Sequence, residues 1–459
     1  MNIVWLIVDS LSFQATSLAK SGPETMPNLR DLAASEGVTF TEAYAPGPLS
    51  PSSHAAMFTG ELPSIAGMHE AHPYFDGRVP TIAERLRETH ETYLFSLNMW
   101  LFQGLDCGFS QTKDFSRQYL LFRDATDPLD YFRKHGSEGS ELEKFCRFAT
   151  NDGKPFRSLL NYLNYRRTSG RLIPEKWGDV ENYQYAAQIN EELLSTLNNG
   201  GRDSFIFANY MDVHPPYDAS DEALERFAPD LGREDLPIGV DPERHIPNEK
   251  KSYDPELMKR LYRAAIWDFD RKMGPVLRRL VETDTMVIVT SDHGIWDHDT
   301  AYSENRLHVP LVIFAPDEQP RIVDKTVNLM SIPRTIMECA TSRDGNFCGQ
   351  SLLNVTEDQM SVTEIIHHPN EVYRKTGRVD VTKTLVSTAE VQRDLVLIKG
   401  DARVEYIGGT WNVTGGGNDT VAELRSSAEE ILSTGIHIGS GGGEYDSVTQ
   451  QRLEDLGYL

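Results

Sequence analysis

Lysine is scarce in this chain, and positive charge is outweighed by negative charge. The 459 residues contain 45 Lys plus Arg against 69 Asp plus Glu, a formal net charge of −24, and 14 of the basic residues are lysine. A field of this sign repels nucleic acid and anionic membrane surfaces, so we expect neither as a partner. Acidity with little lysine suggests a protein adapted to a salt-rich (halophilic) cytoplasm. A mildly acidic protein from any other source is the alternative.

Cysteine is also rare, and long apolar runs are missing. The four cysteines, Cys107, Cys146, Cys339 and Cys348, form no closely spaced pair, which argues against a disulfide framework and against a cysteine metal site. The apolar run that opens the chain is too short to cross a membrane, and it has no basic start or cleavage site of a signal peptide. We therefore expect buried thiols in a reducing compartment and place the protein in the cytoplasm.

The first 340 residues alternate between apolar, β-branched segments and helical patterns. This alternation is typical of an α/β fold with a mainly parallel central sheet, here a three-layer arrangement of sheet and helices. Thr25 is expected to cap the helix that follows it. The expected strands are residues 2–9, 38–45, 92–96, 204–210, 285–290 and 309–315, and the expected helices are residues 26–36, 80–89 and 255–282.

Two segments interrupt the alternation, and a different pattern follows it. Residues 110–200 are more polar and aromatic, and residues 218–253 are rich in Asp, Glu and Pro, so we expect both as insertions that shape the rim of a pocket. The sequence predicts a catalytic α/β domain over residues 1–340 and a small C-terminal α+β subdomain with an antiparallel sheet over residues 345–459. The elements expected in the second part are strands at 385–388, 394–399 and 404–407 and a helix near 420–434.

Polar side chains stand where the predicted strands end. Asp9 follows the first strand, Asp292 and His293 follow the strand at 285–290, and His214 follows the strand at 204–210. In open α/β sheets ligands collect at the carboxyl ends of the strands. Ser50 precedes a small-residue segment that reads as a helix, so we expect it at a helix N-terminus, where free N–H groups favour an anion.

Each of these residues also has an ordinary structural interpretation. Asp9 could be a turn or cap residue, Ser50 a helix cap, and Asp292-His293-Gly294 a simple turn. His214, beside two prolines, could be a packed structural histidine. Together, however, they are an oxygen and nitrogen donor set at one edge of a sheet, which is a set that binds metal ions. The combination therefore favours a catalytic metal site over four separate turns.

The same segments, in the same chain order, resemble the sulfatase family of the alkaline phosphatase superfamily. The resemblance rests on the strand that ends in Asp9, the segment from Ser50 to Gly60, the Met-Asp-Val-His-Pro-Pro-Tyr segment that contains His214, and Thr-Ser-Asp-His-Gly before His-Val-Pro-Leu. It implies a sulfatase-like hydrolase with an alkaline-phosphatase-like fold. Its substrate would be a small anionic ester, sugar-linked in some members of the family.

The resemblance also implies roles for individual residues. Asp9, Ser50, Asp292 and His293 would bind one divalent cation: Ca²⁺, Mg²⁺ or Mn²⁺, with Zn²⁺ left open by the histidine nitrogen. Ser50 would be the nucleophile. His214 would contact the anionic oxygens of the substrate or protonate the leaving group.

Several positions depart from the family pattern. His54 falls where sulfatases have the arginine that supports the nucleophile, and His298 falls near a second family histidine, with shortened spacing. Ser52 takes the place of the proline in the signature that directs oxidation to formylglycine, so we expect an unmodified Ser50. The family's substrate-binding lysine has no counterpart, and Arg306 can replace its charge but not its geometry.

These departures leave the substrate open. A phosphorylated serine is readily attacked at phosphorus, whereas a sulfated serine is harder to resolve, so the chemistry favours phosphoric esters while the motifs favour sulfuric esters. A phosphotransferase that passes a headgroup from Ser50 to an acceptor alcohol is one alternative. A metal-binding protein that has lost turnover is the other.

Overall fold

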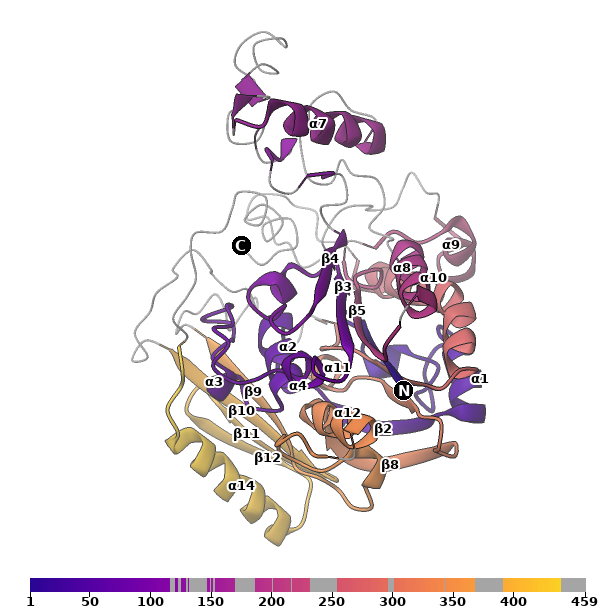
Figure 1. The fold of residues 1–459 in the computed structure, drawn as a ribbon. Helices are drawn as coiled ribbons and strands as arrows, with labels where there is room; N and C mark the ends of the chain where they lie inside the picture. Colours follow the sequence, from indigo (N-terminus) through magenta and orange to yellow (C-terminus); the bar gives the residue numbers. More distant parts are fainter. Residues whose placement is uncertain are drawn as a thin grey trace.

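In the part of the chain that it describes, the computed structural model contains two β-sheets with helices packed on them (Figure 1). No helix in the described part of the chain combines the length and the apolar character that spanning a bilayer requires. The structure describes residues 1–115, 120–122, 125–128, 131, 147–148, 150–151, 153–169, 186–199, 201–215, 217–231, 254–295, 301–341, 343–367 and 391–438.

The larger sheet is mixed but mostly parallel, which confirms the predicted α/β fold. Among the described strands of this sheet, only β7 runs antiparallel to both of its neighbours. Its strands, in spatial order, are β4 (Gln111–Asp114), β3 (Glu91–Ser96), β5 (Ser204–Tyr210), β1 (Asn2–Val8), β6 (Thr285–Thr290), β7 (Leu311–Phe314), β2 (Val38–Tyr44) and β8 (Arg321–Asn328).

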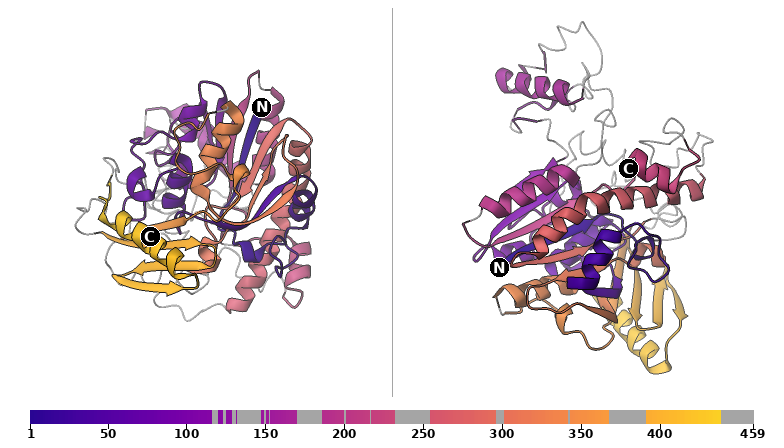
Figure 2. Two further views of the ribbon diagram at one scale, coloured as in Figure 1. Left: turned by 90° about the horizontal axis from the view of Figure 1, so that it is seen from below. Right: turned by 90° about the vertical axis from the view of Figure 1, so that its right-hand side faces the viewer.

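Helices cover both faces of this sheet, so its central strands are buried on both sides and are almost entirely apolar. Figures 1 and 2 show α1, α8, α9 and α10 on one face and α2, α4 and α12 on the other. The first group is α1 (Pro27–Glu36), α8 (Ala186–Asn199), α9 (Asp221–Phe227) and α10 (Pro255–Val281). The second group is α2 (Ser50–Thr59), α4 (Ile82–Leu86) and α12 (Ile332–Thr341).

The remaining short helices lie in the connections. They are α3 (Pro63–Ala66), α11 (Glu304–Leu307), and the 3₁₀ turns η1 (Phe13–Ala15), η2 (Met99–Phe102), η6 (Leu329–Ser331) and η7 (Leu352–Asn354). Helix α7 (Pro155–Ser169) stands apart from both sheets in Figure 1. Part of the expected insertion at 110–200 and the greater part of the one at 218–253 lie outside the described residues.

The smaller sheet is antiparallel and carries one helix. Its order is β12 (Thr410–Thr414), β11 (Ala402–Ile407), β10 (Gln392–Lys399) and β9 (Ser361–His367), and α14 (Asn418–Ser433) packs on it. Leu424 and Ala428 of the helix enter the apolar core of this sheet. The strand expected at 385–388 lies outside the described residues. The division into domains at 1–340 and 345–459 stays a prediction.

One expected cap is wrong. Thr25 does not cap α1, because its hydroxyl donates to the carbonyl of Ala15 (2.6 Å), and the residue before the helix is Met26. Helix α1 begins instead with Pro27, whose fixed φ suits a first helical position. The N–H groups of Asn28 and Leu29 in its first turn donate to the carboxylate of Asp270 in α10. The carboxylate of Asp270, on another helix, therefore accepts N–H groups of the first turn that we expected the Thr25 side chain to accept.

Candidate active site

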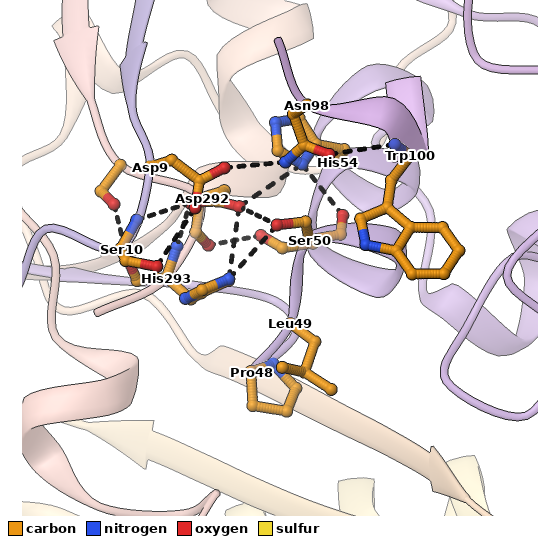
Figure 3. Close-up of polar contacts among 12 residues, drawn as sticks. Asp9, Ser10, Pro48, Leu49, Ser50, His54, Asn98, Trp100, Asp292 and His293 are labelled. Atoms are coloured by element: carbon orange, nitrogen blue, oxygen red, sulfur yellow. Dashed lines mark hydrogen bonds and ion pairs between the residues drawn. The ribbon is translucent and has the colours of Figure 1, made fainter. Parts of the chain in front are cut away.

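The candidate site lies where strands β1 and β6 end side by side (Figure 3). Asp9 follows β1 directly, and Asp292 and His293 follow β6, so parallel pairing alone brings them to one edge of the sheet. All three side chains are buried, with at most 1% of their surface exposed. One carboxylate oxygen of each aspartate and one ring nitrogen of His293 lie within 4.8 Å of one another.

Helix α2 brings Ser50 to the same place. Ser50 is its first residue, preceded by the extended Leu49, and Pro51 fits the first turn because it needs no N–H partner. The Ser50 hydroxyl donates to Oδ2 of Asp292 (2.7 Å) and lies 3.4 Å from Nε2 of His293. The Ser53 hydroxyl donates to the main-chain carbonyl of Asp292 (2.6 Å) and fixes the start of the helix against the loop after β6.

The state of His293 suits a metal ligand. Burial and the nearby positive charge of Arg306 lower the pKa of His293 well below its ordinary value, so the ring is neutral. The carbonyl of Gly294 lies 2.9 Å from Nδ1 and can only accept, so Nδ1 carries the proton. This leaves the Nε2 lone pair on the side of Asp292, 3.4 Å from Oδ2.

These residues fit a divalent cation. Two carboxylates buried this close together are costly unless a positive charge lies between or beside them. The donors are oxygens of Asp9 and Asp292 and a neutral imidazole, a set that divalent cations accept. The Ser50 hydroxyl lies within hydrogen-bonding distance of this set and could add a fourth donor.

His54 lies one turn along α2 from Ser50. Its Nδ1 donates to the Ser50 carbonyl (2.9 Å) and lies 3.6 Å from Oδ2 of Asp292. Its ring meets the rings of Phe58 and Phe207 edge to face, and Nε2 is buried without a hydrogen-bond partner among the described residues. His54 therefore contacts the main chain of Ser50 and the carboxylate of Asp292 from within the apolar core.

His214 reaches the site from the turn after β5, and Arg306 reaches it from the short helix α11. His214 is buried in the turn after β5, and it belongs to the charges that lower the pKa of His293, behind burial and Arg306. The buried guanidinium of Arg306 donates to the carbonyls of Pro48 (2.6 Å) and Gly294 (3.0 Å). A positive charge therefore sits between the loop before Ser50 and the loop after His293.

Two asparagines that were not predicted from the sequence hold Asp9 in place. Oδ2 of Asp9 accepts from the side-chain amides of Asn98 (2.7 Å) and Asn209 (3.3 Å), which follow or belong to β3 and β5. Ser10, next in the chain, has a positive φ of 61° and donates its hydroxyl to Oδ1 of Asp9 (3.1 Å). The same signal that selected Asp9, a polar residue at a strand end, also marks Asn98. His298 lies outside the described residues.

Comparison with known proteins agrees with the resemblance. The sequence model of the Sulfatase family matches residues 1–342. The uncharacterized sulfatase YidJ of Escherichia coli K12 is 24% identical over 389 residues, which cover 79% of this chain and 72% of YidJ. Arylsulfatase K of Canis lupus familiaris is 21% identical over 392 residues, 78% of this chain and 66% of that protein.

Solved structures share the fold. The phosphonate monoester hydrolase of Silicibacter pomeroyi has a TM-score of 0.60 at 17% identity, over 94% of both chains. BT4656, solved with its substrate D-glucosamine-2-N,6-O-disulfate, has a TM-score of 0.61 at 15% identity, over 99% of this chain and 98% of that one. At these identities the likeness concerns the fold, which confirms the expected alkaline-phosphatase-like architecture.

Proposed function

Since the chain belongs to the sulfatase family, and is therefore an ester hydrolase of the alkaline phosphatase superfamily, we propose that Ser50 is its nucleophile. The substrate is a small sulfuric or phosphoric ester, sugar-linked as in the ligand of BT4656. The observation that carries the proposal is the position of the Ser50 hydroxyl, at a buried helix N-terminus and 2.7 Å from the Asp292 carboxylate.

Asp9, Asp292 and His293 would hold a divalent cation together with Ser50, and Asp292 accepts the hydrogen bond of the Ser50 hydroxyl. When bound, the ion would supply positive charge that favours the alkoxide of Ser50 and the developing charge on the transferred group. The N-terminus of α2 at Ser50 also favours an anion, because the first N–H groups of a helix have no partner within it. Arg306 adds a fixed positive charge without leaving its two carbonyl partners.

The reaction proceeds in two displacements. Ser50 Oγ loses its proton to solvent and attacks the sulfur or phosphorus, the bond to the leaving oxygen breaks, and His214 gives that oxygen a proton. Water then attacks the sulfur or phosphorus of the ester on Ser50 and releases sulfate or phosphate, and its two protons regenerate the Ser50 hydroxyl and the protonated His214. His54 keeps the Ser50 carbonyl and the Asp292 carboxylate in place relative to each other during both steps. His298 is a further proposed member of the site, on the family pattern alone.

The experiment compares Ser50→Ala with the wild-type chain on aryl sulfate, aryl phosphate and aryl phosphodiester. We expect Ser50→Ala to lose about 10³-fold or more of kcat, because no other group replaces the nucleophile. Thr59→Ala is the matched control, since it removes a hydroxyl from the far end of the same helix, where Thr59 donates to the Ala55 carbonyl. Unchanged turnover by Ser50→Ala refutes the nucleophile.

The ester panel also separates the substrate classes. Preference for phosphorus esters identifies Ser50 as an unmodified, phosphatase-like nucleophile. Preference for the sulfate means either that Ser50 is modified despite its altered signature or that plain serine suffices for a sulfuric ester. Transfer to an added alcohol in place of water identifies the headgroup transferase. Assays in high salt test the proposed adaptation to a salt-rich environment, and the cytoplasmic location stays a prediction.

A further inference from the structure

Each of the two site carboxylates has one oxygen occupied by N–H donors. Oδ2 of Asp9 accepts hydrogen bonds from the side-chain amides of Asn98 and Asn209, as Figure 3 shows for Asn98. Oδ1 of Asp292 receives the main-chain N–H groups of Ser10 (3.3 Å) and His293 (2.9 Å). An oxygen that accepts two N–H groups has its lone pairs engaged and is a poor metal ligand at the same time.

The surrounding hydrogen bonds fix the orientation of both amides. Oδ1 of Asn98 accepts the main-chain N–H of Trp100 (3.0 Å), so the end that faces Asp9 is the NH₂ group. Oδ1 of Asn209 accepts the hydroxyl of Ser96 (3.2 Å), with the same result. Ser96 also accepts the main-chain N–H of Asn98 (2.7 Å), which links the two asparagines across strands β3, β5 and β1.

One oxygen of each carboxylate remains for the ion. Oδ2 of Asp292 contacts the Ser50 hydroxyl, and Oδ1 of Asp9 contacts the hydroxyl of Ser10, whose proton can rotate away. With Nε2 of His293 and the oxygen of Ser50, the protein offers four single-atom ligands, one of them nitrogen. Ca²⁺ prefers six to eight oxygen ligands and often takes both oxygens of a carboxylate, whereas Mg²⁺ and Mn²⁺ accept octahedral sites completed by water or substrate.

We propose that Asn98 and Asn209 are positioning residues that restrict Asp9 to single-oxygen coordination, so that the site selects a six-coordinate ion such as Mn²⁺ over Ca²⁺. The inference rests on the proposed function only in that the ion is the one used in that reaction. It assigns a role to two neutral side chains that touch neither the substrate nor the ion, and it narrows the four cations that the sequence left open.

The test is the affinity of the metal-free full-length protein for Mn²⁺ and, separately, for Ca²⁺, by titration calorimetry without substrate. We expect the wild type to bind Mn²⁺ at least about 10-fold more tightly than Ca²⁺. Asn98→Ala and Asn209→Ala should each weaken Mn²⁺ binding about 10-fold or more and weaken Ca²⁺ binding less, because the freed oxygen can then join a bidentate site. The preference for Mn²⁺ over Ca²⁺ should therefore be smaller in both variants than in the wild type.

The matched control is Asn28→Ala, which removes an asparagine amide that donates to a carboxylate away from the candidate metal site, that of Asp270. Asn28 donates to Oδ2 of Asp270 (2.9 Å) just as Asn98 donates to Asp9, and its loss should leave both affinities unchanged. Thermal unfolding checks that each variant folds. If Asn98→Ala fails to fold because the Trp100 N–H loses its cap, Asn209→Ala, which removes no cap, decides the question.

Two results overturn the inference. The first is that the wild-type protein binds Ca²⁺ as tightly as Mn²⁺. The second is that both variants lower the affinities for Mn²⁺ and Ca²⁺ by the same factor, which is what a purely structural role of the asparagines would produce. Because no substrate is present, either result leaves the nucleophile untouched. Conversely, full turnover by Ser50→Ala refutes the proposed function and leaves the metal preference standing.

Discussion

Glu70 is a buried carboxyl group beside helix α2, and replacing it by glutamine should stabilise the protein at alkaline pH. Oε1 of Glu70 accepts a short hydrogen bond from the Ser52 hydroxyl, and Oε2 accepts the main-chain N–H of Ile366 in β9 (3.3 Å). Burial raises the pKa of Glu70 to about 7, although these hydrogen bonds and the nearby His367 oppose the shift. The folded protein therefore favours the protonated acid.

The sign and size of the effect follow from this shift. A raised pKa contributes stability that is complete below the ordinary glutamate pKa of 4.5 and is lost as the pH rises through about 7. One pKa unit corresponds to about 1.4 kcal/mol, so the loss above pH 7 approaches about 3 kcal/mol.

Glutamine can replace the protonated acid without a clash. Its carbonyl oxygen can accept the Ile366 N–H, and its NH₂ group can donate to the Ser52 hydroxyl, whose own proton then goes to the Leu49 carbonyl at 3.1 Å. We expect Glu70→Gln to raise the free energy of unfolding by up to about 3 kcal/mol at pH 8 and to leave it nearly unchanged near pH 4.5.

The measurement is denaturant unfolding of the wild type and of Glu70→Gln at several pH values between these limits. Glu61→Gln is the control, because Glu61 is partly exposed and its loss should not reproduce the pH dependence. An equal gain at pH 4.5 and pH 8, or no gain at pH 8, would refute the reasoning that an ionised Glu70 strains the folded state.

Two further substitutions test contacts elsewhere in the fold. Arg393→Met leaves the buried carboxylate of Glu364 without the guanidinium that lies 3.0 Å away in the wild type. We therefore expect the free energy of unfolding to fall by about 3–5 kcal/mol, and a loss below about 1 kcal/mol would contradict this. Gly47→Ala places a Cβ 2.2 Å from the Ser52 hydroxyl and must displace the first turn of α2. We expect the variant to fold but kcat to fall about 10²-fold, and an unchanged kcat would contradict this prediction.

The sequence predicted the candidate site because polar residues at strand ends often bind ligands. Strands β1 and β6 read clearly as apolar runs, so the residues that follow them, Asp9, Asp292 and His293, could be placed together from the strand pattern alone. Ser50 was predicted at a helix N-terminus from the Pro and Ser that surround it, and α2 does begin there. The mainly parallel sheet and the family resemblance are confirmed by the structure and by the comparisons.

The sequence could not predict the partners that lie across strands. Asn98 and Asn209 meet Asp9 because β5 lies between β3 and β1, and this strand order depends on packing that no local pattern records. Edge strands were missed for a related reason. Strand β4 is polar and largely exposed, and β8 is buried only along part of its length, so neither shows the apolar run that marks a central strand.

The small sheet has a consequence for any attempt to dissect the chain. Thr363 and Glu364 of β9 bond the carbonyl groups of Ala45 and Pro46, on the segment that leads to Ser50, and Ile366 of the same strand bonds Glu70 beside α2. A fragment cut at residue 342, where the match to the Sulfatase family ends, would lose these contacts to the segment that leads to Ser50. We therefore expect the smallest active unit to be larger than the segment that this match covers.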